Sequence, residues 1–104
     1  MTHKPVIARE RAAADVDDAL TYYLTEASEQ VAMGFLDELE QAYAHISRFA
    51  ETGSNRYAYE LNLPGLRAWP MNSYPYVIFY MPSRDHIEVW RILHAKRDIP
   101  LVVI

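Results

Sequence analysis

The chain has 104 residues, no cysteine and a formal net charge of −4 at pH 7. This length allows one domain with its own hydrophobic core, and the lack of cysteine excludes disulfides, thiolate nucleophiles and zinc sites with cysteine ligands. No apolar run approaches the roughly 20 residues that a membrane span needs, and the N-terminus lacks the apolar core of a signal peptide. We therefore expect one cytoplasmic domain over residues 1–104, without membrane association.

The charges are unevenly distributed along the chain. Residues 1–60 carry five basic and eleven acidic side chains, and residues 61–104 carry five basic and three acidic, so the two parts come to −6 and +2. A free-standing nucleic-acid binder usually has a broad positive field, which is absent here. An acidic partner would meet the C-terminal part of the chain.

The N-terminal half predicts a short strand followed by two helices. The apolar run Pro5–Ala8 suits a strand, and apolar residues then recur at steps of three and four from Ala12 to Leu24. Ser28 is a suitable cap for a second helix over about Glu29–Ala50, which has the clearest helical period in the chain. The short connection makes the two helices antiparallel neighbours.

The C-terminal half predicts strands. Residues alternate with a period of two over Tyr57–Leu63, and Leu66–Met71 reads as a short strand. Tyr74–Met81 and His86–Leu93 are rich in aromatic and β-branched residues and are joined by Pro82–Asp85, which predicts a hairpin. Because tight turns connect these strands, we expect an α+β fold in which both helices pack on one face of a small, mainly antiparallel sheet.

The last six residues, Ile99–Ile104, are apolar without polar relief. An exposed segment of this kind would promote aggregation. The favoured interpretation is that it folds back onto the sheet of its own chain, and the alternative is that it binds a partner.

An ordered set of short segments resembles a known family. These segments are Pro64-Gly65-Leu66-Arg67, Tyr74–Tyr80, Ile87–His94 and Arg97-Asp98. They are similar to the corresponding segments of ParE-type toxins of the RelE/ParE superfamily over about residues 64–98. The resemblance implies a RelE/ParE-like domain that is the toxin of a type II toxin–antitoxin pair, neutralised by a cognate ParD-like antitoxin and meeting DNA only through that antitoxin.

The resemblance leaves two activities open, since ParE relatives are associated with poisoning DNA gyrase and RelE relatives with cutting messenger RNA on the ribosome. RelE-type toxins often place an arginine directly after the tyrosine that precedes the hairpin, whereas this chain reads Tyr74-Pro75-Tyr76. A sequence pI near 5.5 is also awkward for docking into ribosomal RNA. Gyrase inhibition is therefore favoured over RNA cleavage, and a third alternative is a non-toxic relative that retains only antitoxin binding.

RNA cleavage would need a proton acceptor, a proton donor and positive charge beside the phosphate. The residues that could serve under that alternative are Arg67, Tyr80, Arg91 and His94. The residues that could instead contact a protein partner are Arg67, Trp90, Arg91, His94 and Arg97. Neither a metal nor a cofactor is expected, because the histidines outside this region are scattered and no phosphate-binding loop is present.

Each candidate also has a structural interpretation. Arg67 and Arg91 could pair with Glu60 or Glu88 on neighbouring strands, and Arg97 could pair with the adjacent Asp98. Trp90 could pack in the core. Strict alternation would place it on one face with Glu88 and Ile92 and place Val89 and Arg91 on the other, without deciding which face is buried.

Overall fold

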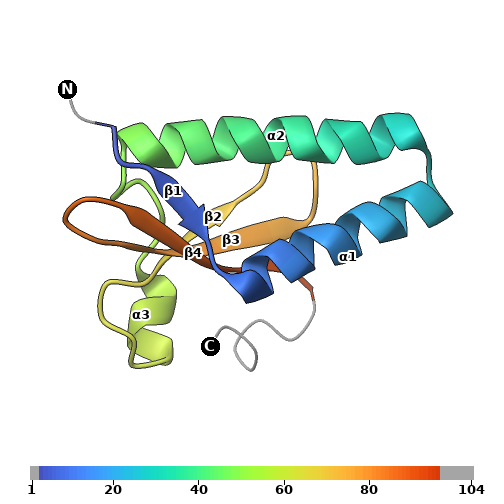
Figure 1. Ribbon diagram of the computed structural model, residues 1–104. Coiled ribbons are helices and arrows are strands. Elements are labelled where there is room, and N and C mark those ends of the chain that lie inside the picture. Colours follow the sequence, from blue (N-terminus) through green and yellow to red (C-terminus); the bar gives the residue numbers. More distant parts are fainter. Residues whose placement is uncertain (1–2, 97–104) are drawn as a thin grey trace.

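The computed structural model describes residues 3–96, in which two long helices precede most of a four-stranded sheet (Figure 1). The elements are β1 (Val6–Ala8), α1 (Glu10–Glu26), α2 (Glu29–Arg48), α3 (Arg56–Glu60), β2 (Arg67–Pro70), β3 (Tyr76–Pro82) and β4 (Ile87–His94). The predicted α+β class is confirmed. Arg97, Asp98 and the segment Ile99–Ile104 lie outside the described residues.

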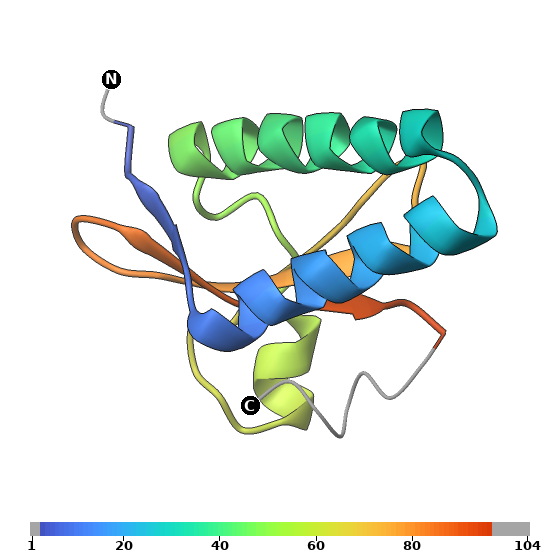
Figure 2. The same ribbon diagram turned by 45° about the vertical axis from the view of Figure 1, so that its right-hand side comes forward.

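The two long helices form an antiparallel pair joined by a short connection, as predicted (Figure 2). Ser28 caps α2, because its hydroxyl accepts a hydrogen bond of 3.1 Å from the main-chain N–H of Val31. The helix then runs to Arg48, close to the predicted end at Ala50. In α1 and α2 the buried residues recur at helical spacing, so each helix directs one apolar stripe toward the sheet.

The sheet has the strand order β1-β4-β3-β2. The predicted hairpin is present as the antiparallel pair β3 and β4, and β2 is antiparallel to β3. The first strand differs, since β1 runs parallel to β4 with Val6 opposite Ile87. A tight turn cannot join two parallel neighbouring strands, which need a long crossover connection. Here the connection from β1 to β4 contains all the other helices and strands of the described chain.

The strand expected over Tyr57–Leu63 is wrong, because residues 56–60 form the short helix α3. The alternation misled because Tyr57, Ala58 and Leu61 also share one face of a helical turn, and all three pack against the sheet. The turn that follows needs left-handed backbone at Asn62 (φ 55°) and Gly65 (φ 91°), which interrupts any strand here.

The sheet buries side chains on both faces, and the two faces are covered differently (Figures 1 and 2). On the first, which we call the helical face, α1 and α2 pack against Tyr76, Ile78, Tyr80, Ile87, Val89 and Ile92. On the second, the α3 face, the short helix and its following turn pack against Leu66, Ala68, Val77, Phe79 and Leu93.

The alternation expected through Trp90 is wrong because β4 contains a bulge. Phe79 pairs with Arg91 and Tyr80 pairs with Val89, so Trp90 is the extra residue between them. The bulge shifts the period, and Val89 and Ile92 both belong to the core of the helical face. Trp90 instead lies against the core of the α3 face and is only partly buried.

Candidate functional site

Arg67 and Tyr80 are neighbours across β2 and β3, and both hold the loop that contains Gly53. Arg67 donates from Nη1 to the carbonyl oxygen of Gly53 at 3.0 Å and to that of Glu51 at 3.4 Å. The Tyr80 hydroxyl accepts a 2.9 Å hydrogen bond from the Gly53 N–H. A glycine is required because a Cβ at this position would lie 2.7 Å from that hydroxyl and 3.0 Å from the Ala68 carbonyl.

Tyr80 is fully buried, so its hydroxyl has no open path to a substrate. Burial raises the pKa of this hydroxyl above its ordinary value, and the Gly53 hydrogen bond opposes that rise. The group therefore stays neutral and serves as an acceptor within the core. Its position is that of a structural anchor for the loop between α2 and α3.

Arg91 forms a bidentate pair with Asp15 of α1, through Nε at 2.8 Å and Nη2 at 2.9 Å. The Asp15 carboxylate also accepts a 2.9 Å hydrogen bond from the main-chain N–H of Ile92. Glu88 and Glu60, which the sequence left open as partners, pair instead with Arg9 and Arg56. Hydrogen bonding to Asp15 raises the pKa of Arg91, and the same hydrogen bonds join α1 to β4.

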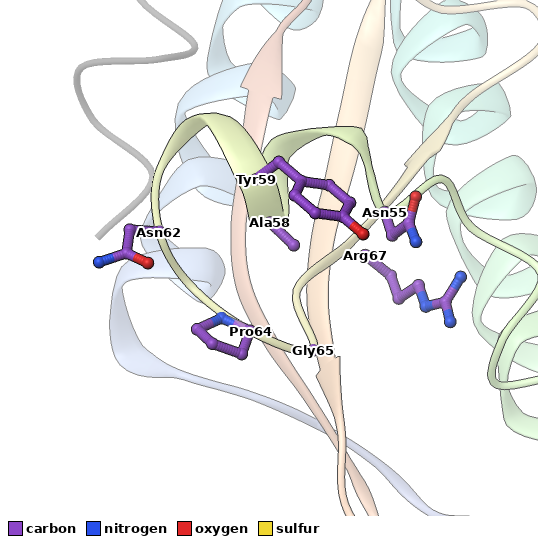
Figure 3. A pocket seen from close by; sticks show the side chains of 7 residues that line it. All are labelled: Asn55, Ala58, Tyr59, Asn62, Pro64, Gly65 and Arg67. Carbon is purple, nitrogen blue, oxygen red and sulfur yellow. The ribbon is translucent and has the colours of Figure 1, made fainter.

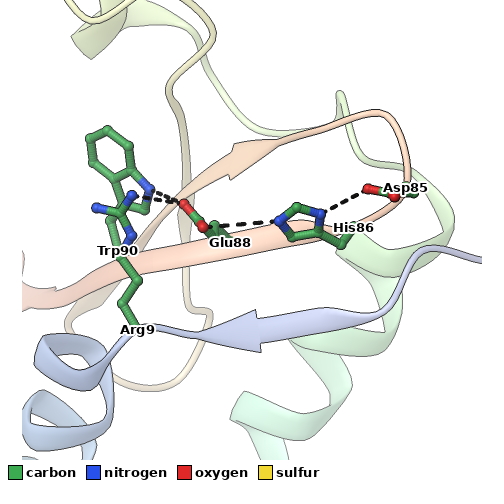
Figure 4. Close-up of polar contacts among 5 residues, drawn as sticks. All are labelled: Arg9, Asp85, His86, Glu88 and Trp90. Carbon is green, nitrogen blue, oxygen red and sulfur yellow. Dashed lines mark hydrogen bonds and ion pairs between the residues drawn. The ribbon is translucent and has the colours of Figure 1, made fainter.

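Trp90 belongs to a polar cluster on the α3 face of β4 (Figure 4). Its indole N–H donates to Glu88 at 3.0 Å, and the same carboxylate pairs with Arg9 at 2.9 Å. The Arg9 guanidinium lies 4.4 Å from the centre of the indole ring, within cation–π range. The hydrogen bond from Trp90, more than the charge of Arg9, lowers the pKa of Glu88.

The cluster continues to the hairpin turn through His86, which lies between two carboxylates (Figure 4). Its Nδ1 is 2.9 Å from Asp85 and its Nε2 is 3.9 Å from Glu88. The hydrogen bond from His86 lowers the pKa of Asp85. This chain of contacts links the start of α1 to the tip of the hairpin.

His94 ends β4 opposite Tyr76, at the far end of β3 from Tyr80. Its ring contacts the Tyr76 ring at 5.4 Å, and its Nδ1 accepts a 3.2 Å hydrogen bond from the Lys96 N–H. The residues considered for RNA cleavage therefore lie in three separate places: Arg67 with Tyr80, Arg91 with Asp15, and His94. Among the described residues they do not converge on one position where a phosphate could react.

A pocket of about 410 Å³ opens beside α3 (Figure 3). Its lining residues come from α3, the turn after it and the start of β2, and they are Asn55, Ala58, Tyr59, Asn62, Pro64, Gly65 and Arg67. The volume lies within the range of small-molecule and side-chain binding sites. Tyr59 is 83% exposed, and Figure 3 shows its ring above the pocket with the hydroxyl directed toward Asn55.

Of the polar residues that line this pocket, the sequence identified Arg67 as a candidate site residue. It did not identify Asn55, Tyr59 or Asn62. It missed them because a strand was predicted where α3 forms. The segment itself carries no signal that separates the two, because a helix of five residues repeats too little of its period to be distinguished from strand alternation.

Two kinds of feature are absent from the described part of the chain. Residues 3–96 contain no cluster of three histidine or carboxylate side chains suited to a metal ion. None of their helices combines the length and apolar character that crossing a bilayer requires.

The fold and these clusters define a small α+β domain, and comparison with known proteins gives its family. A family model described as the ParE toxin of the type II toxin–antitoxin system parDE matches residues 6–99. The chain belongs to the ParE toxin family and is a type II toxin. The resemblance inferred from its motifs is thereby confirmed.

A solved structure supports the fold. The chain superposes with a TM-score of 0.75 and 18% sequence identity on a protein described as the chromosomal ParDE TA system from P. aeruginosa. The similarity covers 90% of this chain and 98% of that one. No curated relative matches the sequence.

Proposed function

We propose that this toxin acts by inhibiting DNA gyrase and that a cognate ParD-like antitoxin neutralises it by direct binding. Membership of the ParE family over residues 6–99 carries the proposal, since it establishes the type II toxin on which both finer statements rest. The toxin would meet DNA only through the antitoxin, in keeping with its net charge of −4.

The choice of gyrase over messenger RNA is supported by the state of the candidate catalytic groups. The Tyr80 hydroxyl is buried and accepts from Gly53, and Arg91 is engaged by Asp15. RNA cleavage needs an accessible acid and base at one phosphate, and Pro75 stands where RelE-type toxins often carry an arginine. We therefore assign no catalytic residue and interpret Arg67, Trp90, Arg91, His94 and Arg97 as candidates for partner contact or for support of such a contact.

Antitoxin binding is supported by large apolar side chains on the surface of the helical pair. Tyr22, Leu24 and Met33 lie near the connection between α1 and α2, and each is more than half exposed, at 57%, 54% and 51%. Large apolar side chains that are left exposed are candidates for contact with a protein partner. A polar, helical antitoxin segment with one apolar stripe would cover them.

The test is expression of the toxin from a tightly regulated promoter, with and without the adjacent antitoxin gene. We expect growth arrest, altered plasmid supercoiling and double-strand breaks with intact messages, and we expect the antitoxin to restore growth. Purified toxin should inhibit supercoiling by purified gyrase. Cleaved messages with unchanged supercoiling would instead support the RNA-cutting alternative, and normal growth would support a non-toxic relative.

A further inference from the structure

Within residues 3–96, the arginine of the pocket beside α3, Arg67, forms no ion pair with a carboxylate. Within residues 3–96, Arg9, Arg56 and Arg91 each form an ion pair with an acidic side chain. Arg67 is half-buried and bonds to two main-chain carbonyls instead. These bonds fix the guanidinium in place without neutralising its charge, and a fixed, partly desolvated guanidinium is a strong carboxylate receptor.

The rest of the lining suits a peptide more than a simple ion. Asn55 and Asn62 belong to this lining, and an asparagine side chain carries both a donor and an acceptor, which are the pairing groups of a peptide unit. Ala58 and Pro64 supply an apolar floor for the methylene groups of a side chain. Tyr59 projects beside them with 83% of its surface exposed, and exposed tyrosines are frequent anchors of protein interfaces.

We propose that this pocket receives an aspartate or glutamate side chain from the surface of DNA gyrase, with Arg67 binding the carboxylate and Tyr59 packing against the residues around it. The inference rests on the proposed function. It adds the surface of the toxin that meets the target and the chemistry that the target must present.

A protein ligand fits better than a nucleic acid because, of the residues that the structure describes, one cation, Arg67, lines the pocket. Affinity for RNA or DNA depends on neutralising several phosphates, whereas the chain carries a net charge of −4. One arginine, two amides and a tyrosine suffice for one carboxylate and its neighbouring peptide groups.

A folded surface fits better than an extended antitoxin segment because the sheet edge beside the pocket is closed. Ser54 exchanges two hydrogen bonds of 2.9 Å with Ala68 of β2, and so occupies the outer edge of that strand. An extended segment cannot add there as a further strand. The pocket is left to receive a side chain that projects from a folded partner, and gyrase is that partner in the proposed function.

The test uses substitutions that leave the core untouched. Tyr59→Ala removes the exposed ring, and Asn62→Asp adds a negative charge to the pocket with almost no change of shape, on a backbone (φ 55°) that aspartate tolerates. The matched controls lie on α2 and at its C-terminal end: Phe49→Ala removes another exposed aromatic ring, and Gln41→Glu adds the same charge to an exposed position. Each full-length variant is measured for gyrase inhibition, antitoxin binding and thermal unfolding.

We expect both pocket variants to raise the toxin concentration for half-inhibition of supercoiling by about tenfold or more. Their antitoxin affinity and unfolding temperature should match wild type, and both controls should inhibit like wild type. If the wild-type toxin inhibits gyrase and the pocket variants do so equally well, or if they lose antitoxin binding instead, the pocket inference is wrong while the proposed function stands. A wild-type toxin without effect on gyrase overturns both.

A second measurement tests the chemistry of the pocket without gyrase. In an NMR titration of the wild-type toxin, N-acetylglutamate should shift the amide signals of Arg67 and Asn62, and N-acetylglutamine should not. Inorganic phosphate and adenosine monophosphate serve as the nucleic-acid probes. Binding of these phosphates without binding of N-acetylglutamate would overturn the proposal in favour of a nucleic-acid site.

Discussion

The two faces of the sheet differ in how much apolar surface they bury and in which helices cover them. On the helical face, α1 and α2 seal a core in which Phe35, Ile78 and Tyr80 are fully buried. On the α3 face a five-residue helix covers a smaller cluster, and the pocket opens beside it. Most of the stability should come from the first face, since it buries more apolar surface. The second face can then carry exposed side chains at little cost to folding.

The largest expected effect is that of Phe35→Ala on the helical face. Its ring is fully buried and contacts Tyr74 and Tyr76 at 5.5 and 5.4 Å, so truncation leaves a cavity and should cost about 3–5 kcal/mol. The counterpart on the α3 face is Tyr57→Ala, which removes a half-buried ring from Phe79 and should cost clearly less. Urea unfolding of both variants measures the difference, and equal losses would contradict the proposed division between the faces.

The next effect in size concerns Asp15→Asn, which tests how the helical face is fastened to β4. The side chains of Asp15 and Arg91 are only 11% and 15% exposed. Removing the negative charge weakens the hydrogen-bonded ion pair of a nearly buried guanidinium, and we expect a loss of about 2–3 kcal/mol, below the full cost of breaking a completely buried pair.

The control for this variant is Asp18→Asn, an exposed carboxylate on the same helix. It should change the free energy of unfolding by no more than about 0.5 kcal/mol. If the two variants have the same free energy of unfolding, the ion pair between Asp15 and Arg91 makes no net contribution to stability.

A smaller effect is expected for Tyr80→Phe, which also separates the proposed function from RNA cleavage. The change removes the acceptor of the buried Gly53 N–H and should cost about 1–2 kcal/mol, the range for a buried donor left unsatisfied. Toxicity per folded molecule should remain, because this hydroxyl holds a loop. Loss of toxicity with normal unfolding temperature and antitoxin binding would point to a catalytic tyrosine.

The sequence predicted the helical face better than the α3 face, and the reason is physical. A helix of twenty residues repeats its apolar stripe often enough for Phe35, Leu39 and Ile46 to identify the buried side. A helix of five residues makes little more than one turn, so its period cannot be told from the alternation of a strand. The bulge at Trp90 was equally hidden, because only the pairing with β3 reveals the extra residue.

The sequence indicated which residues belong to the candidate site, but it did not predict which residues they contact. Arg67 and Arg91 stood out as charges within apolar strands, yet their partners are the Gly53 loop and Asp15, which lie 14 and 76 positions away in the chain. Contacts at such separations depend on how the elements pack, which short motifs do not encode. The pocket was missed for the same reason, since its walls come together only when α3 turns back toward β2.

The smallest predicted effect concerns Glu88, at the cluster that joins α1 to the hairpin. Its pKa is lowered by the hydrogen bond from Trp90 and by Arg9. A carboxyl whose pKa is lower in the folded than in the unfolded chain adds stability above its unfolded pKa, and that contribution disappears as the pH falls through the folded value. Because the Glu88 side chain is 33% exposed and that of Arg9 is 50% exposed, the contribution should stay below about 1 kcal/mol.

Glu88→Gln should therefore lower stability slightly at pH 7, and this deficit should shrink as the pH is lowered toward 3, because the wild-type carboxyl takes up a proton as the pH falls through its lowered pKa. Unfolding by urea across this pH range measures the difference between the two proteins. The exposed Glu40→Gln on α2 is the control, and its difference from wild type should vary little with pH. A Glu88→Gln deficit that persisted undiminished at pH 3 would mean that shape and hydrogen bonding, and not charge, hold this corner of the α3 face to the first helix.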